Sequence, residues 1–115
     1  MSKKDNIIVG KSGEERALKY LKKNRYKILE TNYKNTIGEI DIICRKRKTL
    51  VFVEVKTRVG DFFGRPSEAV NVSKQNKIRS VAMGYLKHKK KIDSLVRFDV
   101  IEVLESDINH IENCF

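Results

Sequence analysis

Four charged side chains interrupt two strongly apolar segments of this sequence. Residues 39–43 alternate carboxylates with isoleucines around Asp41, and residues 53–57 alternate valines with Glu54 and Lys56. Alternation with a period of two is typical of β-strands, in which successive side chains point to opposite faces of the sheet. Carboxylates and an ammonium group that share one face can bind a divalent cation or carry out acid–base chemistry.

The strand period also predicts which neighbours these groups have. It places Glu39, Asp41 and Ile43 on one face of the first strand. Ile40 and Ile42 then face the opposite side. The sequence therefore predicts two acidic side chains on a single sheet face.

The two strands are predicted to form a hairpin. If residues 47–48 form a two-residue turn, opposed residues have numbers that sum to 95, so Asp41 faces Glu54 and Glu39 faces Lys56. Opposed carboxylates repel one another unless a cation or proton lies between them. A set of oxygen ligands without Cys or His favours a hard ion, Mg²⁺ or Mn²⁺. The alternative is a cross-strand ion pair between Glu39 and Lys56, with the other two carboxylates solvated.

The remaining pattern predicts an α/β fold with the order α-β-β-β-α-β, a mixed central sheet and flanking helices. A capping-box pattern, Ser12 followed by Glu15, predicts that the first helix begins at Ser12. Ser73 is the predicted N-cap of the last helix. The predicted elements are a helix over 12–23, strands over 26–33, 39–45 and 50–57, a loop over 59–66, a short helical segment over 66–70, a helix from 73 to about 88, a strand over 97–103, and an edge strand or tail over 108–115.

One apolar stripe identifies the buried face of the last predicted helix, and Lys74 and Lys77 lie outside this stripe. Residues spaced three and four apart lie on the same side of a helix. The stripe consists of Ile78, Val81, Ala82, Tyr85 and Leu86. This helix is therefore predicted to cover one face of the sheet.

The chain has 115 residues with 25 Lys and Arg against 15 Asp and Glu, a formal charge of +10. Its length predicts a single domain over residues 1–115. A strong positive charge favours nucleic acid as a partner over the alternative of a merely soluble basic surface. No apolar stretch approaches the roughly 20 residues of a membrane-spanning helix, and no signal peptide is recognisable, so we expect a cytoplasmic protein without membrane contact. Cys44 and Cys114 show no disulfide or metal spacing.

Asp41 followed by Glu54-Val55-Lys56 resembles the signature of the PD-(D/E)XK nuclease superfamily, with Ile40 in place of the usual proline. The resemblance to the YraN-like, endonuclease-like bacterial family is far more extensive. It runs through Gly13-Glu14, Ala17, Tyr20-Leu21, Asn32-Tyr33, residues 38–43, residues 51–58, Phe63-Gly64-Arg65-Pro66, Glu68-Ala69-Val70 and residues 97–101. This resemblance implies a restriction-endonuclease-like core and metal-dependent hydrolysis of DNA phosphodiester bonds.

The resemblance also implies roles for individual residues. Asp41 and Glu54, with the carbonyl of Val55, would bind Mg²⁺ or Mn²⁺, and Lys56 would orient or deprotonate the attacking water. The family is related to archaeal Holliday junction resolvases, in which a Glu-Arg pair on the first helix supplies another acid. Glu15 matches that acid, although it could equally serve the capping box. Since the resolvases act as dimers, branched DNA and a homodimer also enter as expectations.

The basic residues nearest to these acids are the candidates for contacts with the nucleic-acid backbone. They are Arg58, Arg65, Lys74 and Lys77. For Arg45 to Lys48, contact with phosphates and simple solubility both remain open, and residues 87–91 are interpreted as a solvated helix end. Asp99 interrupts an apolar strand and is interpreted as a structural, hydrogen-bonded acid. The alternative functions are a nucleic-acid-binding module of the same fold with little or no hydrolytic activity, and an assembly factor.

Overall fold

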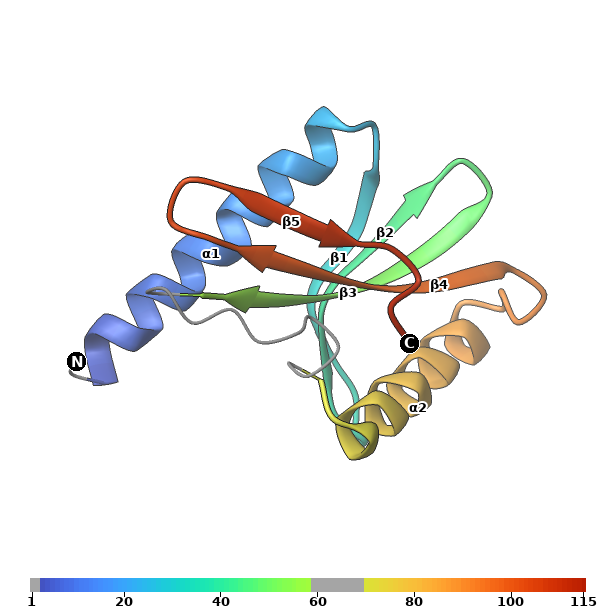
Figure 1. Ribbon diagram of the computed structural model, residues 1–115. Helices are drawn as coiled ribbons and strands as arrows, with labels where there is room; N and C mark the ends of the chain where they lie inside the picture. Colours follow the sequence, from blue (N-terminus) through green and yellow to red (C-terminus); the bar gives the residue numbers. More distant parts are fainter. Residues whose placement is uncertain (1–2, 59–69) are drawn as a thin grey trace.

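A computed structural model describes residues 3–58 and 70–115, with side chains described from residue 12 onward (Figure 1). Within these residues it contains two helices and five strands. They are α1 (Lys3–Lys23), β1 (Lys27–Lys34), β2 (Glu39–Lys46), β3 (Thr49–Thr57), α2 (Val72–His88), β4 (Leu95–Val103) and β5 (Ile108–Ile111). The α/β class with a mixed sheet and flanking helices is confirmed.

The five strands form one sheet in sequence order, β1-β2-β3-β4-β5. All neighbouring pairs are antiparallel except β3 and β4, which are parallel. A parallel pair requires a crossover, and α2 lies within that crossover. The predicted strand or tail over 108–115 is the short strand β5 followed by a tail, in which Cys114 N–H donates to the carbonyl of Phe98 (2.7 Å).

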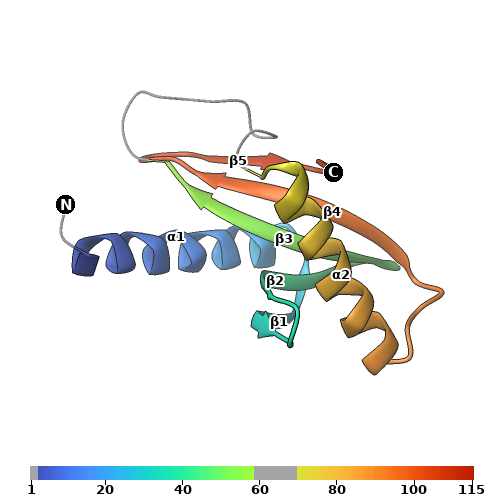
Figure 2. The same ribbon diagram turned by 90° about the horizontal axis from the view of Figure 1, so that it is seen from below.

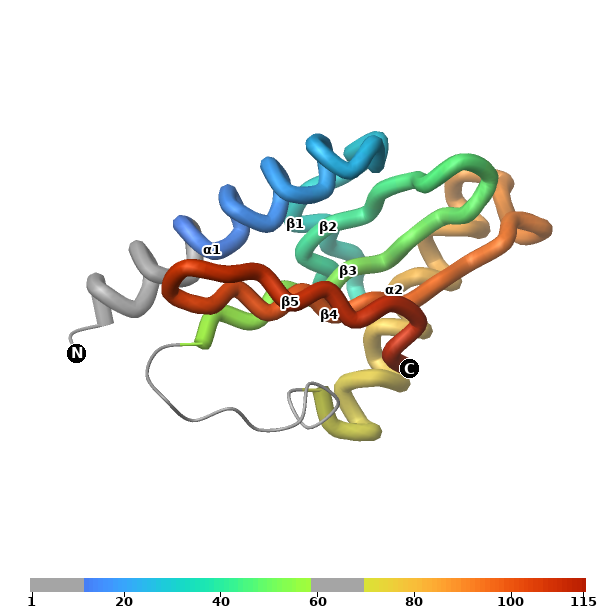
Figure 3. The backbone as a smooth tube through the Cα atoms, turned by 45° about the horizontal axis from the view of Figure 1, so that its top comes forward, coloured from blue at the N-terminus to red at the C-terminus, as the bar shows by residue number. Residues whose placement is uncertain are grey.

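The two helices lie on opposite sides of the sheet, as the views in Figures 2 and 3 show. On one side Ala17 and Leu21 of α1 pack against Ile42, Val51 and Val53 of the sheet. On the other side α2 packs against sheet residues that include Phe52. Each strand of the hairpin therefore contributes to two separate apolar clusters, which explains why both strands are rich in aliphatic residues.

The predicted apolar stripe of α2 is confirmed, because all five of its residues are buried. The predicted cap is wrong by two residues. Asn71, rather than Ser73, is the N-cap, and its side-chain oxygen accepts a hydrogen bond from Lys74 N–H (2.8 Å). Asn and Ser are both good N-caps, so local preference alone does not decide between them.

The first helix begins far earlier than its capping-box signal predicts. α1 starts at Lys3, so Ser12 lies in the middle of the helix and cannot be its N-cap. A helix that has formed gains one hydrogen bond for each further residue, which favours extension towards the N-terminus beyond the capping-box residues. The capping role of Glu15 is therefore excluded.

The hairpin register is confirmed where the two strands pair. Ile42 pairs with Val53 and Ile43 with Phe52, and both sums equal 95. The turn consists of two residues, Arg47 and Lys48, as expected. The predicted loop over 59–66 and the short helical segment over 66–70 lie almost wholly outside the described residues.

The predicted alternation along β2 fails at Ile40. Ile40 belongs to the same apolar cluster as Ile43, on the α2 side of the sheet, whereas Ile42 lies on the α1 side. The two-residue period therefore breaks at Asp41, between two isoleucines that pack on opposite sides. This break gives Asp41 an environment different from that of the other β2 side chains.

Candidate functional site

Asp41 and Glu54 lie where β2 and β3 stop pairing. The paired residues of the hairpin end at Ile42 and Val53. Beyond that point the backbone N–H of Val55 donates to Asp41 Oδ2 (2.8 Å), so a side chain of β2 bonds the backbone of β3. The two strands thereby hold their carboxylates at a fixed opening in the sheet.

Burial and a second carboxylate disfavour the charged form of Asp41. Burial raises the pKa of Asp41 to about 6, and repulsion from Glu54 adds to the shift. The hydrogen bond from Val55 and the charge of Lys74 act in the opposite direction without cancelling it. Repulsion between Asp41 and Glu54, predicted from their opposed positions, is therefore present in the folded chain.

Glu54 is 7 % exposed, and its carboxylate binds Lys74 Nζ at 3.0 Å. Lys74 lies in the first turn of α2, so the helix within the crossover supplies a cation to the acidic pair. The alternative ion pair between Glu39 and Lys56 is not formed. Glu39 instead pairs with Lys34 across the β1–β2 turn (3.5 Å), because the two hairpin strands have already separated at this level.

Two lysines share the space beside the carboxylates and differ in their proton affinity. Burial and the neighbouring charge of Lys74 lower the pKa of Lys56. Burial acts to lower the pKa of Lys74 as well, but its hydrogen bonds to Lys56 and Glu54 outweigh that effect and raise it. Lys56 is therefore the more readily deprotonated of the two.

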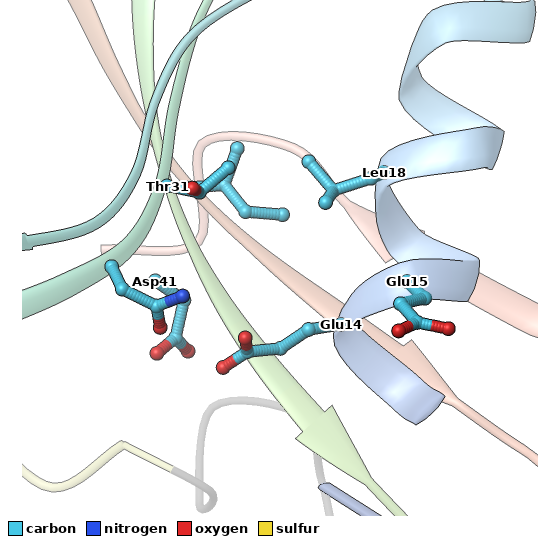
Figure 4. Close-up of a pocket in the computed structure, with 7 residues that line it drawn as sticks. Glu14, Glu15, Leu18, Thr31 and Asp41 are labelled. Carbon is cyan, nitrogen blue, oxygen red and sulfur yellow. The ribbon is translucent and has the colours of Figure 1, made fainter. Parts of the chain in front are cut away.

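A cavity of about 270 Å³ opens beside Asp41 on the α1 side of the sheet. Glu14 and Glu15 of α1 line it together with Thr31 and Asn32 of β1. Figure 4 shows the Glu14 carboxylate directed towards Asp41, whereas that of Glu15 points away. Burial raises the pKa of Glu14, and the charge of Asp41 raises it further. Glu14, rather than Glu15, is thus the α1 acid that interacts with Asp41.

The prediction from sequence missed Glu14 and Asn32. A helical signal for Glu14 was present, since it precedes the buried Ala17 by three residues and the buried Leu21 by seven. Glu15 is one position further around the helix and is exposed. Asn32, whose hydrogen bond lowers the pKa of Glu14, gave no comparable signal in the sequence.

The four basic residues predicted to contact phosphates differ in whether their side chains already bind a carboxylate. Arg58 donates to Glu102 (3.0 Å), an ion pair across β3 and β4 that occupies its guanidinium group. Lys74 is bound to Glu54, while Lys77 is exposed and its stem lies against Gly38. Arg65 lies outside the described residues. The nucleic-acid role of all four residues remains a prediction.

Asp99 has the structural, hydrogen-bonded role that was predicted from the sequence. Its fully buried carboxylate accepts hydrogen bonds from Arg97 (2.9 and 2.8 Å) and from Asn113 N–H (2.9 Å), and it also bonds His110 (2.7 Å). Burial would raise the pKa of Asp99, but these partners together lower it. Nothing about this carboxylate is left unsatisfied.

Among the described side chains, no three Asp, Glu, His or Cys residues come close enough together to form a complete metal site. Cys44 and Cys114 are both free thiols. In the same part of the chain, neither helix has the length and apolar character needed to cross a membrane.

Comparison with known sequences places this arrangement in a family. The UPF0102 protein of Clostridium beijerinckii is 50% identical over 119 residues, covering 98% of this chain and 97% of that protein. The corresponding protein of Alkaliphilus oremlandii is 49% identical, with 96% of this chain and 99% of that protein covered. That of Thermodesulfovibrio yellowstonii is 46% identical, with 95% and 96% covered. Residues 13–103, which include α1 from Gly13 onward and both acidic strands, match the uncharacterised protein family UPF0102, and the chain belongs to that family.

Proposed function

We propose that this protein is a metal-dependent endonuclease that hydrolyses phosphodiester bonds of DNA. The observation that carries the proposal is the repulsive pair of Asp41 and Glu54, held together by the fold at an opening between β2 and β3. A chain gains no stability from opposing two shielded carboxylates, so a functional ligand is the better explanation.

The donor atoms at this site fit Mg²⁺ or Mn²⁺. Asp41 and Glu54 supply carboxylate oxygens, and the resemblance to PD-(D/E)XK nucleases adds the carbonyl of Val55 as a further oxygen donor. Mg²⁺ usually keeps several waters and binds only one or two protein carboxylates together with substrate phosphate, so the pair of Asp41 and Glu54 fits this ion. When bound, the ion would polarise the phosphate and stabilise charge that develops on it.

The two lysines have separate roles in this proposal. Lys56, whose pKa is lowered, accepts or orients a proton of the attacking water. Lys74 neutralises Glu54 when no metal is bound and is free to contact a phosphate once a divalent cation takes its place. In this proposal Glu14, rather than Glu15, is the acid of α1 whose charge acts on Asp41.

The order of the core elements supports a restriction-endonuclease-like architecture. A helix precedes an antiparallel hairpin that carries the acids, and a second helix leads to a parallel strand beside it. This order agrees with the resemblance to PD-(D/E)XK nucleases and to the junction resolvases. Branched DNA is therefore the first substrate to compare with simple duplexes.

The decisive experiment measures cleavage of labelled duplex, single-stranded and four-way-junction DNA with Mg²⁺, with Mn²⁺ and with EDTA. The wild type should cut only with metal, and Asp41→Asn, Glu54→Gln and Lys56→Ala should each lose at least about 100-fold in rate, as is typical for removal of a transition-state contact. Glu105→Gln, which changes an exposed acid in the turn after β4, is the matched control and should cut normally.

Two results would contradict the proposal. Cutting that survives Asp41→Asn and Glu54→Gln would identify a contaminating nuclease or another site. DNA binding without cutting under every metal condition would favour a nucleic-acid-binding module of the same fold. In that case the two carboxylates would require a different ligand.

A further inference from the structure

The positive charge of this protein is concentrated in three short segments. Residues 22–27, 45–48 and 87–91 contain 12 of the 25 Lys and Arg residues and none of the 15 Asp and Glu residues. The rest of the chain keeps 13 basic residues against 15 acidic ones and is slightly negative. The net charge of +10 therefore comes entirely from these segments.

The fold brings the three segments to one end of the sheet. Lys27 pairs with Arg45 across β1 and β2, and the Lys46 ammonium donates to the carbonyl of Asn24, which joins the first two segments. Lys89 approaches Glu30 of β1 (4.0 Å), which joins the third. Figure 3 shows the α1–β1 corner, the β2–β3 turn and the end of α2 towards one end of the sheet, away from the end of β3, and Figure 1 shows α1 and α2 on different sides of the sheet. We call these three segments the distal basic surface.

Most of this charge is not compensated within the fold. Of the twelve basic residues, only Lys89 has a carboxylate within ion-pair distance in the described part of the chain. By contrast, Arg58, which directly follows β3, and Lys74, which contacts Glu54, are both bound to carboxylates. Cations available to an external polyanion therefore lie mainly at the distal end.

The backbone at this surface provides an independent argument. Five residues other than glycine have positive φ in the described chain: two asparagines and Arg25 (67°), Arg47 (55°) and Lys90 (56°). Asparagine tolerates this conformation, whereas long side chains rarely adopt it. Each of the three basic exceptions lies in a different segment of the distal basic surface.

Glycine is the usual residue at all three positions. Arg25 and Lys90 follow the ends of α1 and α2, where Tyr26 N–H bonds the Leu21 carbonyl (2.9 Å) and Lys91 N–H bonds that of Leu86 (2.8 Å). This bonding pattern ends a helix and normally has glycine at the left-handed residue. Arg47 is the first of the two turn residues of the hairpin, another glycine position. A positive charge is thus present where local backbone preference opposes it.

We propose that the distal basic surface is a second contact for the phosphate backbone of duplex nucleic acid. Lys46 lies five positions after Asp41 in β2, a span of roughly 17 Å at the rise of an extended strand. Phosphates on one strand of a duplex repeat about every 3.4 Å, so this surface contacts backbone about five base pairs away from the acidic pair. It therefore sets affinity and the minimum length of duplex rather than sequence preference.

The test compares two variants that lower the net charge equally. Arg47→Gly combined with Lys90→Gly removes two charges from the distal basic surface and relieves the backbone there. Lys19→Gln combined with Arg79→Gln removes two exposed charges elsewhere. Binding of a labelled duplex of about 20 base pairs is measured by fluorescence anisotropy in EDTA over a range of salt concentrations, so hydrolysis plays no part.

The distal variant should bind at least about 10-fold more weakly, and the slope of log K against log salt should become shallower by about 2, because each lost phosphate contact contributes about 0.9. The control should lose less than about threefold. Equal losses in both variants would reduce the effect to net charge and overturn the proposal, as would unchanged binding by the distal variant. If the distal variant melts below the assay temperature, Lys48→Gln with Lys87→Gln, both exposed, replaces it under the same criteria.

This proposal rests on the proposed nuclease function, but the binding test and the cleavage test can fail separately. If the wild type never cuts DNA but the distal variant still binds duplex more weakly, only the proposed hydrolysis is overturned. Cutting with no change in binding would overturn only the distal surface.

Discussion

Asp99 of β4 and Asp41 of β2 lie on the two strands that flank β3 and have opposite environments. Asp99 of β4 pairs with Val53 of β3, one residue before Glu54. The Asp99 carboxylate is surrounded by donors from Arg97, His110 and Asn113. Asp41, by contrast, accepts one described hydrogen bond and faces another carboxylate.

The comparison shows how structural and functional acids differ in one fold. Burial acts to raise the pKa of both groups, but around Asp99 its partners reverse the effect. Around Asp41 the repulsion from Glu54 reinforces the effect. The fold provides hydrogen-bond donors for the Asp99 carboxylate but leaves Asp41 and Glu54 to repel one another. A bound cation would relieve that repulsion.

The largest expected effect is the loss of stability when the satisfied acid is removed. Asp99→Ala leaves Arg97 and His110 without their partner, and removing one member of a buried ion pair costs about 3 kcal/mol. Urea denaturation at neutral pH measures the change in the free energy of unfolding. Glu105→Ala, at an exposed acid, is the control, and a loss below about 1 kcal/mol for Asp99→Ala would contradict a structural role.

The contribution of Asp99 to stability depends on pH with a defined sign. Because the folded state lowers the pKa of Asp99 below its ordinary value of 3.8, the stabilisation is present above about pH 4 and is lost as the pH falls below that value. The difference between wild type and Asp99→Asn should therefore shrink on acidification.

Asp41→Asn should have the opposite effect on stability. The folded state raises the pKa of Asp41 from 3.8 to about 6, so its stabilisation is complete below about pH 4 and is lost as the pH rises through about 6. Asparagine keeps an acceptor for Val55 N–H and removes the repulsion, so the variant should be more stable than wild type by about 2 kcal/mol at pH 8. The gain should vanish at pH 4. A destabilised Asp41→Asn at pH 8 would remove the distinction between the two acidic groups.

Divalent metal should stabilise the acidic pair but not the satisfied acid. At ten times its dissociation constant, Mg²⁺ should add about 1.4 kcal/mol and raise the melting temperature by several degrees. Lys74→Met should show a larger rise than wild type, because no ammonium group then competes for Glu54. Glu54→Gln should show none. An equal rise in all three proteins would indicate binding elsewhere.

The smallest expected effect concerns the acid that completes the cavity. Glu14→Gln should raise stability by about 0.5 kcal/mol at pH 8, since it removes a charge directed at Asp41. In a double-mutant cycle with Asp41→Asn, Glu14 should show a coupling energy of at least about 0.5 kcal/mol. Glu15→Gln, on the exposed side of the same helix turn, should show no coupling. Equal coupling for both glutamates would contradict the described orientation of α1.

The fold was predictable wherever short-range geometry decides it. The register of the hairpin followed from a two-residue turn, because the turn fixes every opposed pair. The buried stripe of α2 followed from helical spacing. The start of α1 and the cap of α2 were wrong, since several residues offer equivalent local signals and packing selects among them.

The site was predictable only in part, for a different physical reason. The opposition of Asp41 and Glu54 is a property of one hairpin and could be deduced. The pairing of Lys74 with Glu54 joins β3 to the helix of the crossover, and the approach of Glu14 to Asp41 depends on how α1 packs. Contacts of that kind require the tertiary arrangement.

The single parallel pairing in the sheet has a consequence for the kinetics of folding. Thr49 pairs with Lys46 across the local hairpin, whereas its parallel partner, Leu95, is 46 positions away along the chain. Local contacts close faster than distant ones, so the hairpin should bring Asp41 and Glu54 together before α2 delivers Lys74. The carboxylates then meet without their lysine, and we expect the folding rate to rise when the pH is lowered towards 5 or when Mg²⁺ is present. The same repulsion that prepares the site for a cation would thus slow the assembly of the molecule.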